Sequence, residues 1–273
     1  MPAATGFQIA ILIFALHFLV LFAIRIGSER LSWPQDTHGD LYYFATFGLL
    51  ILALLAIAPI RRYCQDELRR PIPPNGGREA ALVTIGMVAI PFAMAGATVL
   101  AAFAAGEPAL LASKLLSADP MPSWERSLSF MGAMKILLIS CFAAPIVEEL
   151  VFRGLLYRAW ERQWGWIPSL FLTSLCFGLF HIHNFIATSL ISVVLICMLR
   201  RTGTLRATIL AHMGFNFLVS WPLLGHVLLT IEGREINRMS AWSAELASLV
   251  FVAVALPAYL ALSRRDAREA VIR

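Results

Sequence analysis

Charged residues lie inside an otherwise apolar segment of this chain. The stretch CFAAPIVEELVFRGLLY, residues 141–157, carries Glu148, Glu149 and Arg153. An ionisable group at the centre of a membrane-spanning helix costs about 2.5–3.5 kcal/mol, so such groups generally mark function. In an α-helix Glu149 and Arg153 lie four residues apart on one face and can pair. Glu148 points about 100° away from Glu149, which leaves it without a partner in its own helix.

Three more polar residues occur inside apolar segments at a similar depth. His181 ends the motif FGLFH, and His212 and Asn216 lie four residues apart in HMGFN. Counting from the polar end of each segment places these side chains and Glu148 roughly 10–20 Å below that end. A single His or Asn in a membrane helix commonly hydrogen-bonds to a neighbouring helix. Their joint occurrence with a carboxylate at similar depth favours a shared functional site.

These residue types fit hydrolysis by an activated water molecule. Glu148 can act as a general base, and His181 can share the water with it. His212 and Asn216 carry hydrogen-bond donors that can stabilise the oxyanion of a tetrahedral intermediate. No serine or cysteine occupies a comparable position with an evident acid–base partner. We therefore expect a hydrolase that uses no protein nucleophile.

The three motifs also resemble those of a known family. EELVFRG, FGLFH and HMGFN are similar to the motifs EExxxR, FxxxH and HxxxN of the CAAX protease and bacteriocin-processing family. Members of that family include intramembrane glutamic endopeptidases related to the type II CAAX prenyl endopeptidase. The resemblance covers about residues 140–218 and gives the motifs in the family's order.

The resemblance implies a role for each motif residue. Glu148 would activate the water with help from His181, and His212 and Asn216 would form the oxyanion site. The supporting positions would be Glu149, Arg153 and Phe177. The resemblance implies no cofactor and no metal ion. It implies a membrane-associated peptide or protein as the substrate.

Other functions use similar residues. Two histidines and a glutamate suit Zn²⁺, so a metal-dependent membrane hydrolase is one alternative, although the chain has no HExxH motif. A non-catalytic immunity or scaffold protein of the membrane is a second. A proton-coupled transporter is a third, because Glu and His inside a membrane also form proton relays.

The elements that must position these residues are membrane helices. The chain of 273 residues is 59% hydrophobic and 14% charged, with a mean hydropathy of +0.75, whereas soluble domains are about 25% charged. We predict an all-α, polytopic helical bundle of about eight transmembrane helices. It forms a single membrane domain over residues 1–273, with the motifs in a core of about 127–224. The predicted spans are 7–26, 41–60, 80–105, 127–162, 166–183, 185–199, 207–224 and 243–262.

The distribution of charge predicts the orientation. Arginines concentrate in the loops 61–79 and 200–206 and in the C-terminal tail. By the positive-inside rule these segments are cytoplasmic, which puts both termini in the cytoplasm. We also expect the protein to reside in the cell inner (plasma) membrane. The net charge of +5 therefore reflects topology and contact with the lipid bilayer, and no nucleic-acid partner is expected. We expect His17 and His226 to be peripheral and His183 to be interfacial.

Overall fold

The computed structural model of the chain describes residues 54–107, 137–220 and 238–272, with shorter runs between 8 and 52 and at 134–135. Within these ranges the chain forms helices and turns and no strand, which confirms the predicted all-α class. The predicted spans 7–26 and 41–60 are described only in part, and the loop 225–242 lies largely outside the described residues. The number of eight spans and the single-domain organisation therefore stay predictions.

Three described segments are long and apolar enough to cross a membrane. They are α4 (Gly76–Ala104), α11 (Phe185–Thr202) and residues 245–263 of the longer helix α14 (Arg238–Ile272). The helices α10 (Trp166–Phe180) and α12 (Leu205–Val219) are shorter and also apolar. These helices confirm the prediction of an integral membrane protein.

The predicted loop 61–79 is partly helical. Helix α3 (Ala58–Arg69) starts with Pro59 in its first turn, where the missing N–H costs nothing. It ends before the PIPP sequence that separates it from α4. The Tyr63 hydroxyl donates a 2.9 Å hydrogen bond to the Gly154 carbonyl, and burial raises the pKa of Tyr63 to about 12. The hydroxyl therefore keeps its proton at neutral pH and holds α3 against the helix that carries Gly154.

A single long helix, here called the motif helix, carries the first sequence motif. It consists of η1 (Ile139–Ala143), α8 (Ala144–Glu148), η2 (Glu149–Tyr157) and α9 (Arg158–Trp164), and it corresponds to the end of the predicted span 127–162. The segments η1 and η2 have π-helical hydrogen bonding, a rare geometry that often occurs at functional sites. The helix ends at Gly165, whose φ of +75° suits a residue without a side chain.

The central part of the motif helix, residues 144–160, is largely buried by the rest of the bundle. Its apolar residues form the centre of the larger hydrophobic core, together with residues of α10 and α11. Members of this core that come from the motif helix include Val147, Leu150, Val151, Phe152, Leu155 and Leu156. The charged side chains of Glu148, Glu149 and Arg153 are thus shielded from lipid by neighbouring helices, which offsets the high cost of charge in hydrocarbon.

Helices α10 and α11 form a closely packed pair joined by the short 3₁₀ helix η3 (Ile182–Asn184). Helix α10 ends at Phe180, and not at residue 183 as predicted, because His181 leaves the helical conformation with φ −115° and ψ 53°. The close approach depends on Gly178. A Cβ atom there would lie 2.7 Å from the Phe185 carbonyl oxygen of α11.

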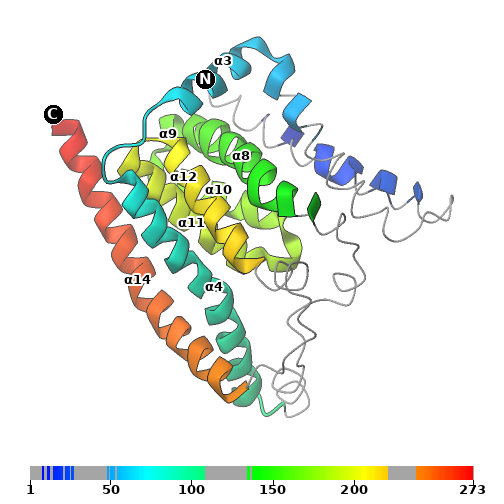
Figure 1. Cartoon of the computed structure of the whole chain (residues 1–273), viewed down its shortest axis with the longest axis vertical. Coiled ribbons are helices and arrows are strands. Elements are labelled where there is room, and N and C mark those ends of the chain that lie inside the picture. Colours follow the sequence, from blue (N-terminus) through cyan, green and yellow to red (C-terminus); the bar gives the residue numbers. More distant parts are fainter. Residues whose placement is uncertain are drawn as a thin grey trace.

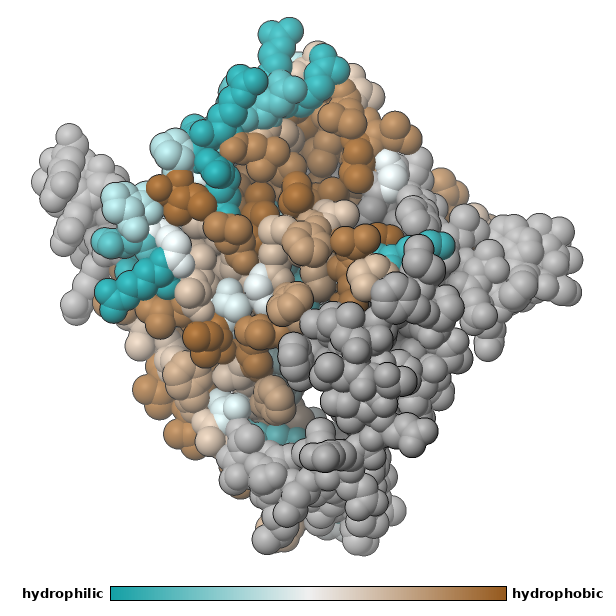
Figure 2. Space-filling view, in the orientation of Figure 1, coloured by the Kyte–Doolittle hydropathy of each residue, from teal (hydrophilic) through white to brown (hydrophobic). Residues whose placement is uncertain are grey.

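Helices α4 and α14 lie side by side along one edge of the bundle (Figure 1). A second core cluster fills the space between α4, α11 and α12, with Met87, Leu195, Met198 and Ala211 among its members. Figure 2 shows hydrophobic residues over most of the described surface in this view, with hydrophilic residues gathered towards its upper end. Large apolar side chains such as Ile85, Phe103 and Val254 are more than 60% exposed. Such a surface suits contact with lipid.

Candidate active site

A cavity of about 640 Å³ brings the predicted site residues together. Glu148 reaches it from α8, His181 from the end of α10, and His212 and Asn216 from α12. Three segments that are far apart in sequence therefore contribute to one site, as their similar depth along the chain indicated. We call this the site cavity.

Glu148 lies between the two histidines. Its side chain is 4% exposed, and each of its oxygens faces a different imidazole. Oε1 lies 3.7 Å from Nε2 of His181, and Oε2 lies 3.7 Å from Nε2 of His212. These distances are longer than a direct hydrogen bond and are close enough for strong electrostatic interaction. The carboxylate is thus held by neighbours that can exchange protons, and no arginine or lysine within the described chain pairs with it.

The backbone of α10 sets the orientation of His181. Its Nδ1 lies 3.0 Å from the Phe177 carbonyl oxygen. A carbonyl can only accept, so Nδ1 carries a proton and donates it. In the neutral ring Nε2 then has a free lone pair, and this atom faces Glu148. His181 is therefore arranged to accept a proton from a group bound beside Glu148.

His212 contacts both glutamates. Its Nδ1 donates to Oε1 of Glu149 over 2.9 Å, while its Nε2 faces Glu148. The same Oε1 atom of Glu149 forms an ion pair of 3.0 Å with Arg153. The predicted pairing of Glu149 with Arg153 is therefore present, and it also extends to a site residue. With Nδ1 held by Glu149, the ring can donate from Nε2 only when it carries two protons.

Phe177 lies at the centre of these side chains. Its ring centroid is 4.3 Å from the Arg153 guanidinium carbon, a distance at which cation–π attraction is significant. It is also 4.6 Å from the ring centroid of His181 and 6.0 Å from that of His212. Arg153 is fully buried between Phe177 and Glu149. Phe177 thus packs against both histidines and the buried cation, in keeping with the supporting role expected of it.

Asn216 binds the backbone of the motif helix. Its side-chain amide donates to the Ser140 carbonyl oxygen over 2.7 Å. In η1 the N–H of Ala144 bonds to the carbonyl of Ile139, five residues earlier. In the same pattern Ser140 would bond to residue 145, which is a proline and has no N–H. The contact made by Asn216 is therefore partly structural, and the second amide hydrogen is left for another acceptor.

His17 lies in the site cavity, so the predicted peripheral position of this residue is wrong. It is buried and lines the cavity, and its ring centroid is 4.4 Å from that of Phe180. The criterion that singled out His181, an ionisable side chain within an apolar run, applies equally to His17 and would have found it. The side chain of His183 and all of His226 lie outside the part of the chain that is described.

The arrangement supplies a carboxylate, two imidazoles and an amide around the site cavity. Carboxylate and imidazole can exchange protons with a bound water, and an amide and an imidazolium can donate to an oxyanion. Among the residues that the structure describes, no three His, Cys, Asp or Glu side chains are grouped as metal ligands. The set of donors and acceptors fits general acid–base hydrolysis.

Comparison with known proteins agrees with the motifs. Residues 130–218 match the family model described as type II CAAX prenyl endopeptidase Rce1-like. The match includes the motif helix, α10 and α11 and reaches Leu218 in α12, so it contains Glu148, His181, His212 and Asn216. It leaves out α3, α4 and α14. No curated protein and no solved structure matches the chain.

Proposed function

We propose that the chain is an intramembrane endopeptidase, because residues 130–218 match the family model described as type II CAAX prenyl endopeptidase Rce1-like. It hydrolyses a peptide bond of a membrane-associated peptide or protein with a water molecule activated by Glu148. The observation that carries the proposal is the position of Glu148, whose two carboxylate oxygens face His181 and His212 inside the site cavity.

The proposed reaction begins with a water molecule held between Glu148 and Nε2 of His181. Glu148 takes a proton from the water as its oxygen forms a bond to the carbonyl carbon of the substrate. The negative charge that develops on the carbonyl oxygen is stabilised by Nε2–H of His212, whose ring carries two protons at this stage, and by the second amide hydrogen of Asn216. The carbon–nitrogen bond then breaks, and the proton moves from Glu148 to the leaving amine.

Glu149, Arg153 and Phe177 act through these residues. Glu149 holds Nδ1 of His212 and thereby directs Nε2 towards the site cavity. Arg153 balances the charge of Glu149, and Phe177 packs against both histidine rings. A buried carboxylate of this kind is expected to be costly without its cation. The three residues therefore position the site and do not take part in bond breaking.

The variant Glu148→Gln tests this function. It keeps the shape of the side chain and removes the base, so it should abolish cleavage while the protein stays folded and inserted. Comparing the membrane proteome of cells that carry the wild type or Glu148→Gln should reveal an uncut precursor only in the variant. Glu107→Gln replaces an exposed glutamate three residues beyond the last residue of α4; it serves as the control and should cut normally. Wild-type cleavage by Glu148→Gln would disprove the assignment.

A chelator distinguishes the metal-dependent alternative. Purified protein that keeps its cleavage rate after chelation, with no gain on adding Zn²⁺, uses Glu148 without a metal ion. A rate that falls on chelation and returns with Zn²⁺ would instead make Glu148 and the two histidines metal ligands. A non-catalytic scaffold would show no accumulated precursor in Glu148→Gln cells and no cleavage in wild-type protein.

We also propose that both termini lie in the cytoplasm and that the protein resides in the inner membrane. The support is the concentration of arginine in the segment 61–79 and in the turn between α11 and α12. In this orientation Glu148 lies about 15 Å from Arg158, which begins the last, cytoplasmic segment of the motif helix; that distance follows from ten residues of helix.

A further inference from the structure

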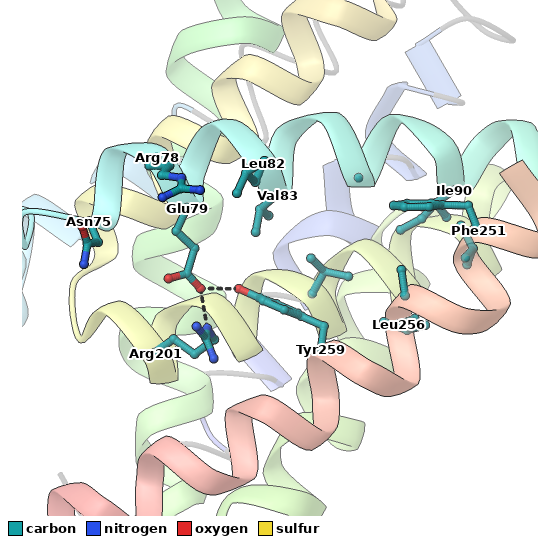
Figure 3. A pocket seen from close by; sticks show the side chains of 14 residues that line it. Asn75, Arg78, Glu79, Leu82, Val83, Ile90, Arg201, Phe251, Leu256 and Tyr259 are labelled. Atoms are coloured by element: carbon teal, nitrogen blue, oxygen red, sulfur yellow. Dashed lines mark hydrogen bonds and ion pairs between the residues drawn. The ribbon is translucent and has the colours of Figure 1, made fainter.

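A second cavity, of about 450 Å³, lies between α4, α11 and α14 (Figure 3). We call it the α4–α14 cavity. It shares no lining residue with the site cavity. Helix α11 separates the two cavities: Ile191 lines the site cavity, and Val194 lines the α4–α14 cavity. The residues of the second core cluster fill the space between the two. Most of its lining comes from α4 and α14, which lie outside the part of the chain that matches the family model.

One end of the α4–α14 cavity is charged. Glu79 accepts hydrogen bonds from Nε of Arg201 over 2.6 Å and from the Tyr259 hydroxyl over 2.7 Å. Arg78 and Asn75 lie at the same end, as Figure 3 shows. The Glu79 carboxylate neutralises Arg201, so the lining of this end keeps one positive charge, that of Arg78. This end is complementary to a ligand with a single negative charge.

The rest of the cavity is apolar and extends along the membrane helices. Its walls are formed by Leu82, Val83 and Ile90 on α4 and by Phe251, Val252 and Leu256 on α14. The distance from Arg78 to Ile90 corresponds to 12 residues of helix, or about 18 Å. One leaflet of the hydrocarbon core is about 15 Å thick, half of the whole. The apolar part therefore matches the length of one lipid leaflet.

From these observations we infer that the α4–α14 cavity binds an anionic phospholipid. The phosphodiester would lie at Arg78 and Asn75, and an acyl chain would lie between α4 and α14. The helices that form the walls are two of the candidate membrane spans, and only 6% of the residues in the most apolar segment of α14 are buried, so lipid can enter from the side. A soluble anion would make no contact with the apolar walls of the cavity, and a lipid without net charge would leave the positive charge of Arg78 uncompensated.

Gly86 offers a way to test the site. It lines the cavity, and a Cβ atom added there would meet nothing within 4 Å. The variant Gly86→Leu should therefore fill the apolar part without displacing its neighbours. Ala255→Leu narrows the cavity from the α14 side and replaces Gly86→Leu if that variant fails to fold. Ala81→Leu is the matched control, because Ala81 is exposed on α4 and does not line the cavity.

Binding can be measured by native mass spectrometry of the purified full-length chain. Wild-type protein should bind phosphatidylglycerol more tightly than phosphatidylcholine with the same acyl chains. Gly86→Leu should lose both lipids, and Ala81→Leu should bind both as the wild type does. Arg78→Gln should weaken phosphatidylglycerol binding about fivefold and leave phosphatidylcholine unchanged, as expected for one basic residue near an anionic head group. Arg62→Gln, an exposed arginine of α3, should have no such effect.

Several outcomes would overturn the inference. Wild-type binding of phosphatidylglycerol by a folded Gly86→Leu variant would show that the lipid lies elsewhere. Equal binding of the two lipids by the wild type would show that Arg78 does not select a charge. Competition by glycerophosphoglycerol, which has the head group and no acyl chain, would make the ligand a soluble anion. A dimer that Gly86→Leu abolishes would make the occupant a second copy of the chain.

Discussion

Glu149 stabilises two neighbours through one oxygen atom. Its Oε1 forms the ion pair with Arg153 and accepts the hydrogen bond from Nδ1 of His212. Both neighbours are buried, and Arg153 is fully so. Removing the charge of Glu149 therefore affects the fold through Arg153 and the site through His212. Glu148, which no cation pairs with in the described chain, has no comparable structural role.

The variant Glu149→Gln should lose both stability and activity. It leaves the Arg153 charge uncompensated in a buried position, which costs about 3–5 kcal/mol, and it weakens the hold on His212. Thermal unfolding in detergent and single-turnover cleavage measure the two effects. Glu148→Gln is the matched control and should lose cleavage alone. A Glu149→Gln protein as stable as the wild type would show that Arg153 does not depend on this ion pair.

Asn216 is predicted to combine a structural and a catalytic role. Asn216→Ala removes the donor to the Ser140 carbonyl, at a cost of about 1–3 kcal/mol, and one oxyanion donor, which lowers turnover about 10²–10³-fold. Thr84→Val is the matched control, because Thr84 donates a similar bond from α4 to the Ala211 carbonyl of α12. It should lower the unfolding temperature and leave single-turnover cleavage unchanged. Normal turnover by Asn216→Ala would leave the oxyanion role to His212 alone.

The sequence predicts which residues line the site cavity, but it does not predict all of the contacts between their side chains. Glu148, His181, His212 and Asn216 do line one cavity, as equal depth along separate helices indicated. The contact between His212 and Glu149 was not predicted. It depends on how far each helix is rotated about its axis, and helices that are apolar on every side give no amphipathic pattern from which to read that rotation. The same lack of pattern hid the position of His17.

At the scale of elements, the length of the apolar segments predicts most of the helices. It does not predict the type of hydrogen bonding within each helix. The sequence predicts a regular α-helix for the motif helix, whereas η1 and η2 are π-helical. Pro145 hints at this irregularity, because a proline inside a helix removes a hydrogen-bond donor. The prolines and arginines of residues 61–79 predict a polar loop. All of its prolines follow Arg70, so the part before them was free to form α3.

Gly178 sets the distance between α10 and α11. In Gly178→Ala the new methyl group would press on the Phe185 carbonyl, and such overpacking costs about 1–3 kcal/mol. Gly86→Ala is the control, because its Cβ meets open space, and it should be neutral or stabilise α4 by up to about 1 kcal/mol. Thermal unfolding of both variants in detergent measures the difference. Equal unfolding temperatures would mean that the α10–α11 pair can separate without cost.

At the scale of the whole molecule, the two ends of α4 report the orientation. Gly77 lies in the first turn of α4 and Glu107 lies three residues beyond its last residue, and both are exposed. With cytoplasmic termini, a cysteine at Gly77 should be protected from an impermeant thiol reagent in intact cells, and a cysteine at Glu107 should react. The reverse pattern would place the arginine-rich end outside the cell.

The native cysteines should give little background in that labelling experiment. Cys64, Cys141 and Cys197 are buried. Burial raises the pKa of Cys64, the one nearest Gly77 in the sequence, to about 11. Thiolate is the reactive form, so Cys64 is largely unreactive at neutral pH. Cys176 is partly buried, and its replacement by serine gives a cleaner starting protein.

The division between Glu148 and Glu149 has an evolutionary consequence. A descendant of this chain that no longer needed to cut peptides could lose Glu148, because that side chain has no cation to support in the described chain. It could not easily lose Glu149, since Arg153 would then be buried without its counter-ion. Selection for folding alone would thus preserve the second glutamate and the arginine long after catalysis had gone. In related chains, the first glutamate of the pair is the better indicator of an active enzyme.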